Sequence, residues 1–158
     1  EGSIEPGAAK RLAAELDARG AQVRVLSLNS PGGSLDEAMA MARLVRKRRL
    51  GTEVADGALC ASSCPLLLAG GTTRAVGVKA AVGVHQFYAA TGPESGAAQA
   101  VADAQITTAR IVRHLTEMGV DPALWLHALD TPPQSLYRLS REELARYGLV
   151  SPEMVAGR

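Results

Sequence analysis

The fold is decided by a strand-to-helix turn with the sequence Asn29-Ser30-Pro31-Gly32-Gly33-Ser34. The apolar run at 22–28 predicts a buried strand before it, and Ser34 with Glu37 forms a capping box that predicts a helix after it. Glycine-rich turns of this kind direct backbone N–H groups outward at a helix N-terminus, where they favour negative charge. The turn lacks the lysine of a phosphate loop and the spacing of a dinucleotide fingerprint. An oxyanion-binding role therefore fits better than a nucleotide site, with an ordinary turn as the alternative.

A second turn carries the sequence Gly57-Ala58-Leu59-Cys60-Ala61-Ser62-Ser63-Cys64-Pro65. Ser62 and Ser63 stand where a short apolar helix is expected to begin, so either residue can be a simple N-cap. Either can also be a nucleophile, provided that a base lies nearby, because a serine hydroxyl is barely ionised at neutral pH.

His85 is the candidate base among three histidines. It follows the apolar run Ala81-Val82-Gly83-Val84, and the tip of a strand can present a side chain to a cleft. A lone histidine in such a place is more often structural. We expect His114 and His127 to be surface residues, because they lie in helices among charged or polar neighbours.

Strand and helix patterns alternate along the whole chain, which predicts one α/β layered domain over residues 1–158. Helices are expected over 6–19, 34–49, 97–118 and 140–148, with another after Asp121 and a turn leading into a short helix over 58–69. Strands are expected over 22–28, 52–55, 74–78 and 81–87, and loops over 88–96 and 130–134.

The composition limits the possible functions. Of the 158 residues, 47% are hydrophobic and 21% are charged, so the chain can bury a core and is not disordered. A net charge of +1 argues against a nucleic acid or an acidic membrane as the main partner. No apolar run reaches the roughly 18 residues that a membrane helix needs. The cationic run at 46–49 is best explained by the end of a helix, where positive charge is favourable.

Together, these segments resemble the Clp protease proteolytic subunit, within the wider Clp/crotonase fold of repeated strand-strand-helix units. The resemblance rests on the glycine-rich turn, on Ala61-Ser62-Ser63-Cys64, on Val84-His85-Gln86, and on the C-terminal run from Leu139-Ser140 to Val150. Four motifs in one order cover nearly the whole chain. The sequence is most similar to exported Clp-like proteins that work without an ATPase and carry a Cys-Ala-Ser-x-Cys motif.

The resemblance implies a role for each matched residue. Ser62 would be the nucleophile and His85 the general base, and the amides of Gly33 and Ser63 would form an oxyanion hole. The aspartate of the family's triad falls on Leu136 when counted back from the C-terminal motif, and leucine cannot orient an imidazole. Asp130, in a loop a few residues earlier, is the substitute candidate.

Cys60 and Cys64 depart from the family, which usually has a small residue at the position of Cys64. Positions i and i+4 near a helix start can come within the Cα separation that a disulfide accepts. A bridge would fix the turn around Ser62 and would imply an oxidising compartment. Two buried free thiols are the alternative, and a cysteine nucleophile is less favoured because both cysteines flank the matched serine.

We therefore expect a serine hydrolase that cleaves peptide or protein substrates by acyl transfer, as a periplasmic or otherwise exported homo-oligomer. We expect no cofactor, no metal and no nucleic-acid partner, and a signal segment outside the printed sequence. One alternative is a catalytically weak scaffold or peptide-binding module, which the missing aspartate favours. Another is a crotonase-type acyl-CoA enzyme, which would use the oxyanion amides without a serine–histidine pair.

Overall fold

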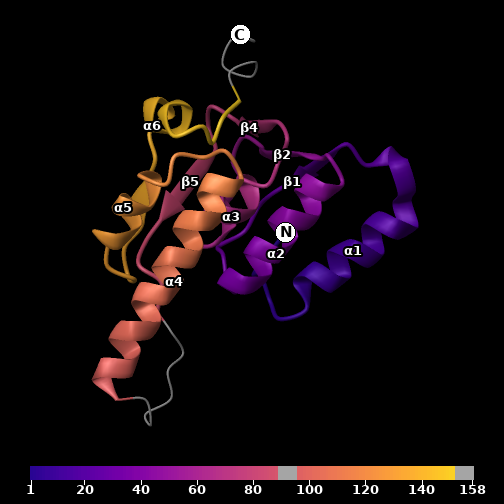
Figure 1. The fold of residues 1–158 in the computed structure, drawn as a ribbon. Coiled ribbons are helices and arrows are strands. Elements are labelled where there is room, and N and C mark those ends of the chain that lie inside the picture. Colours follow the sequence, from indigo (N-terminus) through magenta and orange to yellow (C-terminus); the bar gives the residue numbers. More distant parts are fainter. Residues whose placement is uncertain (89–95, 152–158) are drawn as a thin grey trace.

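The computed structural model describes residues 1–88 and 96–151, so the expected loop over 88–96 lies almost entirely outside the described residues (Figure 1). Six α-helices and one short 3-10 helix are described: α1 (Ala8–Arg19), η1 (Gly20–Gln22), α2 (Leu35–Lys47), α3 (Cys64–Leu68), α4 (Ala97–Glu117), α5 (Leu124–Leu129) and α6 (Arg141–Arg146). The strands are β1 (Val25–Ser27), β2 (Gly51–Val54), β3 (Leu59–Ala61), β4 (Arg74–Val76), β5 (Ala81–Val84) and β6 (Tyr137–Arg138).

Two consecutive strand-strand-helix units, β2-β3-α3 and β4-β5-α4, form the centre of the fold. The first strand of each unit joins the parallel sheet β1-β2-β4, and the second joins the sheet β3-β5-β6. β6 completes the second sheet by pairing antiparallel with β5. After β1 the chain also passes from one sheet toward the other, because Ser30 bridges to Cys60. The expected α/β fold of repeated strand-strand-helix units is confirmed.

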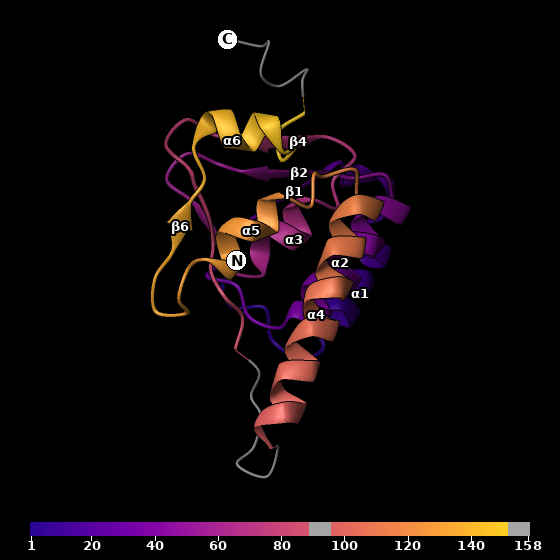
Figure 2. The ribbon, with the colours of Figure 1, turned by 60° about the vertical axis from the view of Figure 1, so that its left-hand side comes forward.

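The core is built around α3, in which every residue is buried. α2 packs against α3, and α1 packs in turn against α2. α4 extends away from this body, and only its C-terminal half carries buried residues (Figure 2). Val101 and Ile106 on α4 are therefore 58% and 59% exposed. None of the described helices is both long and apolar enough to cross a bilayer.

The prediction of a buried strand over 22–28 is wrong in two respects. The chain forms a 3-10 turn through Gln22 before the strand begins, and β1 has only three residues. Val25 is 47% exposed because β1 lies at the edge of its sheet and pairs only with β2. β3 and β6 were not predicted, since three- and two-residue strands leave no readable period.

The prediction that His114 is a surface residue is also wrong. His114 is only 2% exposed, because its face of α4 packs toward α3. Its Nε2 lies 3.0 Å from the Leu66 carbonyl, which can only accept a proton, so Nε2 carries the hydrogen. Burial lowers the pKa of His114 and favours the neutral ring.

The capping box at α2 forms only in part, because one of its side chains is used elsewhere. The Ser34 hydroxyl accepts a hydrogen bond from the Glu37 N–H at 3.3 Å, as expected. The Glu37 carboxylate accepts from the N–H groups of Gly7 and Ala9, both at 2.8 Å. These bonds lower the pKa of Glu37. Glu37 thus satisfies the free amides at the start of α1 and joins α1 to α2.

The cationic run at the end of α2 contributes one structural residue. The Arg46 guanidinium donates to the carbonyls of Gly70 and Met118, beyond α3 and α4, at 2.9 and 3.1 Å. Arg74 donates to the Gly71 and Gly148 carbonyls at 3.0 and 2.8 Å. Burial, together with Arg46, lowers the pKa of Arg74. The two arginines therefore satisfy carbonyls at the ends of three helices.

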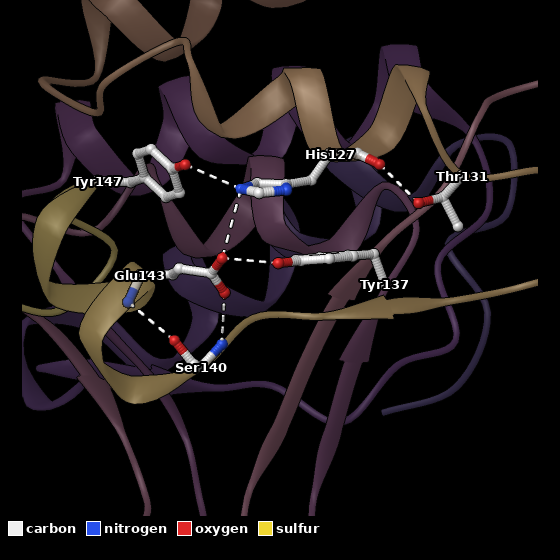
Figure 3. Close-up of polar contacts among 6 residues, drawn as sticks. All are labelled: His127, Thr131, Tyr137, Ser140, Glu143 and Tyr147. Atoms are coloured by element: carbon white, nitrogen blue, oxygen red, sulfur yellow. Dashed lines mark hydrogen bonds and ion pairs between the residues drawn. The ribbon is translucent and has the colours of Figure 1, made fainter.

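A cluster of aromatic and charged side chains joins α5, β6 and α6 (Figure 3). The Tyr137 hydroxyl donates to the Glu143 carboxylate at 2.6 Å, and that carboxylate also accepts from the Ser140 N–H at 2.8 Å. The His127 ring stacks on Tyr137, and its Nε2 lies 2.8 Å from the Tyr147 hydroxyl. His127 is thus a partly buried residue of this cluster, contrary to the surface position that we predicted, with 25% of its side chain exposed.

Hydrogen bonding in this cluster shifts two pKa values in opposite directions. The Tyr137 hydroxyl, followed by the Ser140 N–H, lowers the pKa of Glu143. The same bond to Glu143 raises the pKa of Tyr137. Both shifts favour an ionised Glu143 beside a neutral Tyr137.

Glu143→Gln should lower the melting temperature at neutral pH by about 2–4 °C, the effect of one charged hydrogen bond in a domain of this size. Folding lowers the Glu143 pKa below its ordinary value of 4.5, so the stability that it contributes is present above 4.5 and is lost as the pH falls through the folded pKa. The difference from wild type should therefore shrink at pH about 3, where carboxyl groups are largely protonated. Melting curves at both pH values measure this, with exposed Glu142→Gln as the control; an equal difference at both values contradicts it.

Candidate active site

The two turns singled out in the sequence meet at a cavity of about 480 Å³. Gly32 and Gly33 line it from the first turn, and Ser62 lines it from the second. His85 lines the same cavity from the chain after β5. Three of the predicted site residues, Gly33, Ser62 and His85, therefore line one cavity although they lie far apart in the sequence.

The approach between the turns is too close for a side chain at Gly32. A Cβ atom built there would lie 2.6 Å from the Ala61 carbonyl oxygen and 2.6 Å from the Ser62 Cβ. Gly32 also has φ 97°, which disfavours any residue with a side chain. Glycine is therefore required for the first turn to reach the serine.

The N-terminal segment holds the first turn from its other side. The Ile4 N–H donates to the Gly32 carbonyl, and the Ser34 N–H donates to the Ile4 carbonyl, both at 2.8 Å. This parallel bridge uses the groups that flank Gly33, so the Gly33 N–H faces away from Ile4. It has no hydrogen-bond partner among the described residues. No pattern in the sequence indicated this role of Ile4.

Ser62 has an unusual backbone conformation for a residue with a side chain. It lies between β3 and α3 with φ 62°, in the left-handed region, which costs about 1–3 kcal/mol for a non-glycine residue. Its N–H donates to the Gly83 carbonyl at 3.0 Å, which ties the turn to β5. The side chain lines the cavity and is partly exposed. Sharp turns of this kind present a nucleophile in several hydrolases.

Ser63 stands at the N-cap of α3, but its side chain caps nothing. Its hydroxyl is buried and has no hydrogen-bond partner among the described residues. Its backbone N–H also lacks a partner there. The two serines therefore differ, since only the Ser62 side chain lines the cavity.

Cys60 and Cys64 form a disulfide, with 5.2 Å between their Cα atoms. Both are fully buried, and neither cysteine is free. The predicted bridge is confirmed, and the alternative of two free thiols is wrong. The bond joins the end of β3 to the start of α3 across the turn that carries Ser62.

His85 lines the cavity but forms no hydrogen bond with Ser62 in this structure. Its Nδ1 lies 2.6 Å from the carbonyl oxygen of Gln86, the next residue. A carbonyl oxygen can only accept a hydrogen bond, so Nδ1 carries a hydrogen, and Nε2 has no hydrogen-bond partner among the described residues.

The structure shows no hydrogen bond between Asp130 and His85. Asp130 is exposed at the C-cap of α5, and its carboxylate forms no hydrogen bond or ion pair with the described residues. Leu136, where the triad aspartate was expected by counting, packs against Gly83: a Cβ built on Gly83 would lie 2.6 Å from the Leu136 Cγ. Gly83 and His85 are two residues apart, so side chains at these positions point to the same side of the chain. Leu136 therefore lies on the same side as His85.

The fold and this site define a hydrolase-like α/β domain with a serine and a histidine at one cavity. The family model of the Clp protease matches residues 8–151. The chain belongs to the Clp protease family, whose members are peptidase-type hydrolases that act on peptide substrates and form oligomers. A search of curated proteins finds no match.

Reducing the Cys60–Cys64 bond should slow the labelling of Ser62 by a fluorophosphonate much more than it lowers the melting temperature. A bridge that closes so short a loop removes little entropy from the unfolded chain, whereas it directly holds the turn that carries Ser62. Labelling rate and melting temperature are measured with and without reductant, and the Cys60→Ala/Cys64→Ala variant controls for effects of the reductant. Two free thiols in the unreduced, denatured chain would contradict the bridge itself.

Proposed function

We propose that this protein is a serine peptidase that cleaves peptide bonds by acyl transfer, with Ser62 as nucleophile and His85 as general base. The observation that carries the proposal is the common cavity of Ser62, His85 and the glycine-rich turn. His85 supports it too, because its Nε2, the nitrogen that must accept the serine proton, has no hydrogen-bond partner among the described residues. The absence of a Ser62–His85 bond is compatible with a resting enzyme, where catalytic contacts are often long.

In the proposed reaction, the Ser62 hydroxyl attacks the scissile carbonyl while His85 takes its proton. The resulting oxyanion accepts hydrogen bonds from the N–H groups of Gly33 and Ser63. His85 then gives the proton to the leaving amine, and an acyl ester forms on Ser62. Water, activated by His85, hydrolyses this ester and restores the serine.

The proposed oxyanion hole consists of two backbone N–H groups. The N–H groups of Gly33 and Ser63 lack partners among the described residues; Gly33 lines the cavity, and Ser63 directly follows Ser62, which lines it from the second turn. One such donor stabilises the transition state by about 3–4 kcal/mol. The bridge from Ile4 fixes the direction of the Gly33 group, and the start of α3 fixes that of Ser63.

A catalytically weak peptide-binding module is the second candidate. The exposed position of Asp130 favours it, because no described carboxylate forms a hydrogen bond with His85. Labelling of Ser62 separates the two candidates, since only an activated serine reacts with a fluorophosphonate. The crotonase-type alternative is less well supported, because the matching family is one of peptidases.

Ser62→Ala should abolish fluorophosphonate labelling, whereas Ser63→Ala should retain most of it. Ser63 is a closely matched control, because it is the next residue and only its backbone N–H has a proposed role. Its hydroxyl is buried without a partner, so removing it should cost little stability. Labelling is followed by intact-protein mass. Equal labelling of wild type and Ser62→Ala would refute the assignment of the nucleophile.

We also propose that the protein is an exported homo-oligomer that works without an ATPase. The Cys60–Cys64 disulfide supports export, because such bonds persist in oxidising compartments. The exposed apolar residues of α4 support assembly, because that helix extends from the body with Val101 and Ile106 uncovered.

The mass of the protein in solution should exceed that of one chain, and Ile106→Asp should lower it toward 16.4 kDa. A charge at Ile106 would have to be buried in an interface formed by α4, which is unfavourable without a partner charge. Light scattering coupled to gel filtration measures the mass. Arg113→Asp, an exposed position further along α4, controls for a change of charge alone. A wild-type mass of one chain would contradict the proposal.

A further inference from the structure

The proposed mechanism leaves open which group orients the imidazole of His85. We propose that the main-chain carbonyl of Gln86 takes the place of a catalytic carboxylate, and that Gln86 is the positioning residue that holds this carbonyl. This inference rests on the proposed function. It assigns Gln86 a role in the reaction and removes one from Asp130.

The contact itself sets the correct form of the ring. His85 Nδ1 lies 2.6 Å from the Gln86 carbonyl oxygen, at the short end of hydrogen-bond distances. Because the carbonyl has no proton to give, the contact requires an Nδ1–H group and leaves the lone pair on Nε2. An aspartate in a serine–histidine–aspartate triad holds the same tautomer and orientation.

Two hydrogen bonds fix Gln86 to the chain after α5. Its N–H donates to the Thr131 carbonyl at 2.8 Å, and its side-chain Nε2 donates to the Leu129 carbonyl at 2.7 Å. Thr131 is held in turn, because its hydroxyl donates to the His127 carbonyl at 2.6 Å. His127 belongs to the cluster with Tyr137, Glu143 and Tyr147 (Figure 3). The carbonyl that contacts His85 is therefore part of a well-connected framework.

Among the described residues, the one carboxylate that lines the cavity of His85 is that of Asp36, and it forms an ion pair with Arg110 and no hydrogen bond with His85. Asp130 lies between the two residues that bind Gln86, yet its own side chain is exposed and makes no hydrogen bond there. Leu136 covers Gly83 on the same face of β5. Asp130 thus contributes to the site through the backbone on either side of it and not through its charge.

The test compares Gln86→Met with Gln99→Met and Asp130→Asn. Gln86→Met keeps the length of the side chain and removes its bond to Leu129, while Gln99→Met removes a comparable bond to Asp103 on α4. Gln86→Met should slow labelling by a fluorophosphonate about tenfold, the effect of losing one hydrogen bond. In peptide hydrolysis it should lower kcat and leave KM unchanged. The Gln99→Met and Asp130→Asn variants should keep the wild-type values within about twofold, since their groups do not touch the site.

The tautomer of His85 gives a readout that is independent of activity. In ¹⁵N NMR spectra, assigned by comparison with His85→Asn, wild type and Asp130→Asn should show the Nδ1–H form of His85. Gln86→Met should show a mixture of the two neutral forms. A merely structural role of Gln86 would lower the melting temperature without changing the tautomer.

The outcomes separate the inference from the function on which it rests. An Nδ1–H tautomer that depends on Gln86, in a protein that no fluorophosphonate labels, supports the inference and refutes the peptidase. Labelling that Asp130→Asn abolishes and Gln86→Met leaves intact overturns the inference and keeps the peptidase. An Nε2–H tautomer in wild type also overturns the inference.

Discussion

The close contact between the glycine-rich turn and the turn of Ser62 is the constraint on which the rest of the site depends. Gly32 allows it, because any Cβ there would overlap Ala61 and Ser62. The two sheets make the contact possible, since the chain crosses from one to the other beside Cys60, where Ser30 forms its bridge. Two turns at helix starts thereby meet at one cavity, and the N–H groups of Gly33 and Ser63 have no hydrogen-bond partner in the described part of the chain. Any side chain at Gly32 would therefore push the two turns apart.

The conformation of Ser62 needs support, and one covalent bond, one hydrogen bond and the packing of α3 supply it. Its left-handed backbone is unfavourable by itself. The Cys60–Cys64 bond closes the turn, and the Ser62 N–H is bound to Gly83. The buried helix α3 anchors the end of the turn in the core. Rigid turns keep a catalytic group in place without a loss of entropy during the reaction, which is the general requirement for a preorganised site.

The parts of the fold predicted correctly are those with strong local chemistry. The helices with capping residues or glycine ends and the cysteine bridge follow from neighbours in the sequence, whereas the repeated strand-strand-helix order was expected from the resemblance to the Clp protease family. The errors concern contacts between distant segments. The burial of His114 depends on which face of α4 meets α3, and the exposure of Val25 depends on β1 being an edge strand. No local pattern reports that Ile4 pairs with the first turn, or that Gln86 binds the chain after α5.

A carbonyl beside His85 performs only part of the work of a carboxylate. In the proposed reaction it would fix the tautomer and the direction of the ring, but it carries no net charge to stabilise the imidazolium that would form when Ser62 loses its proton. More of the transition-state stabilisation would then come from the proposed oxyanion hole, whose N–H groups have no partner among the described residues and are directed by Ile4 and α3. The bonds that hold the two turns rigid therefore matter more in this chain than in an enzyme with a charged third residue. The Cys60–Cys64 bond fits this need for a rigid turn, because it holds the turn that carries Ser62. This rigidity matters most where His85 has no charged partner to help it take the proton.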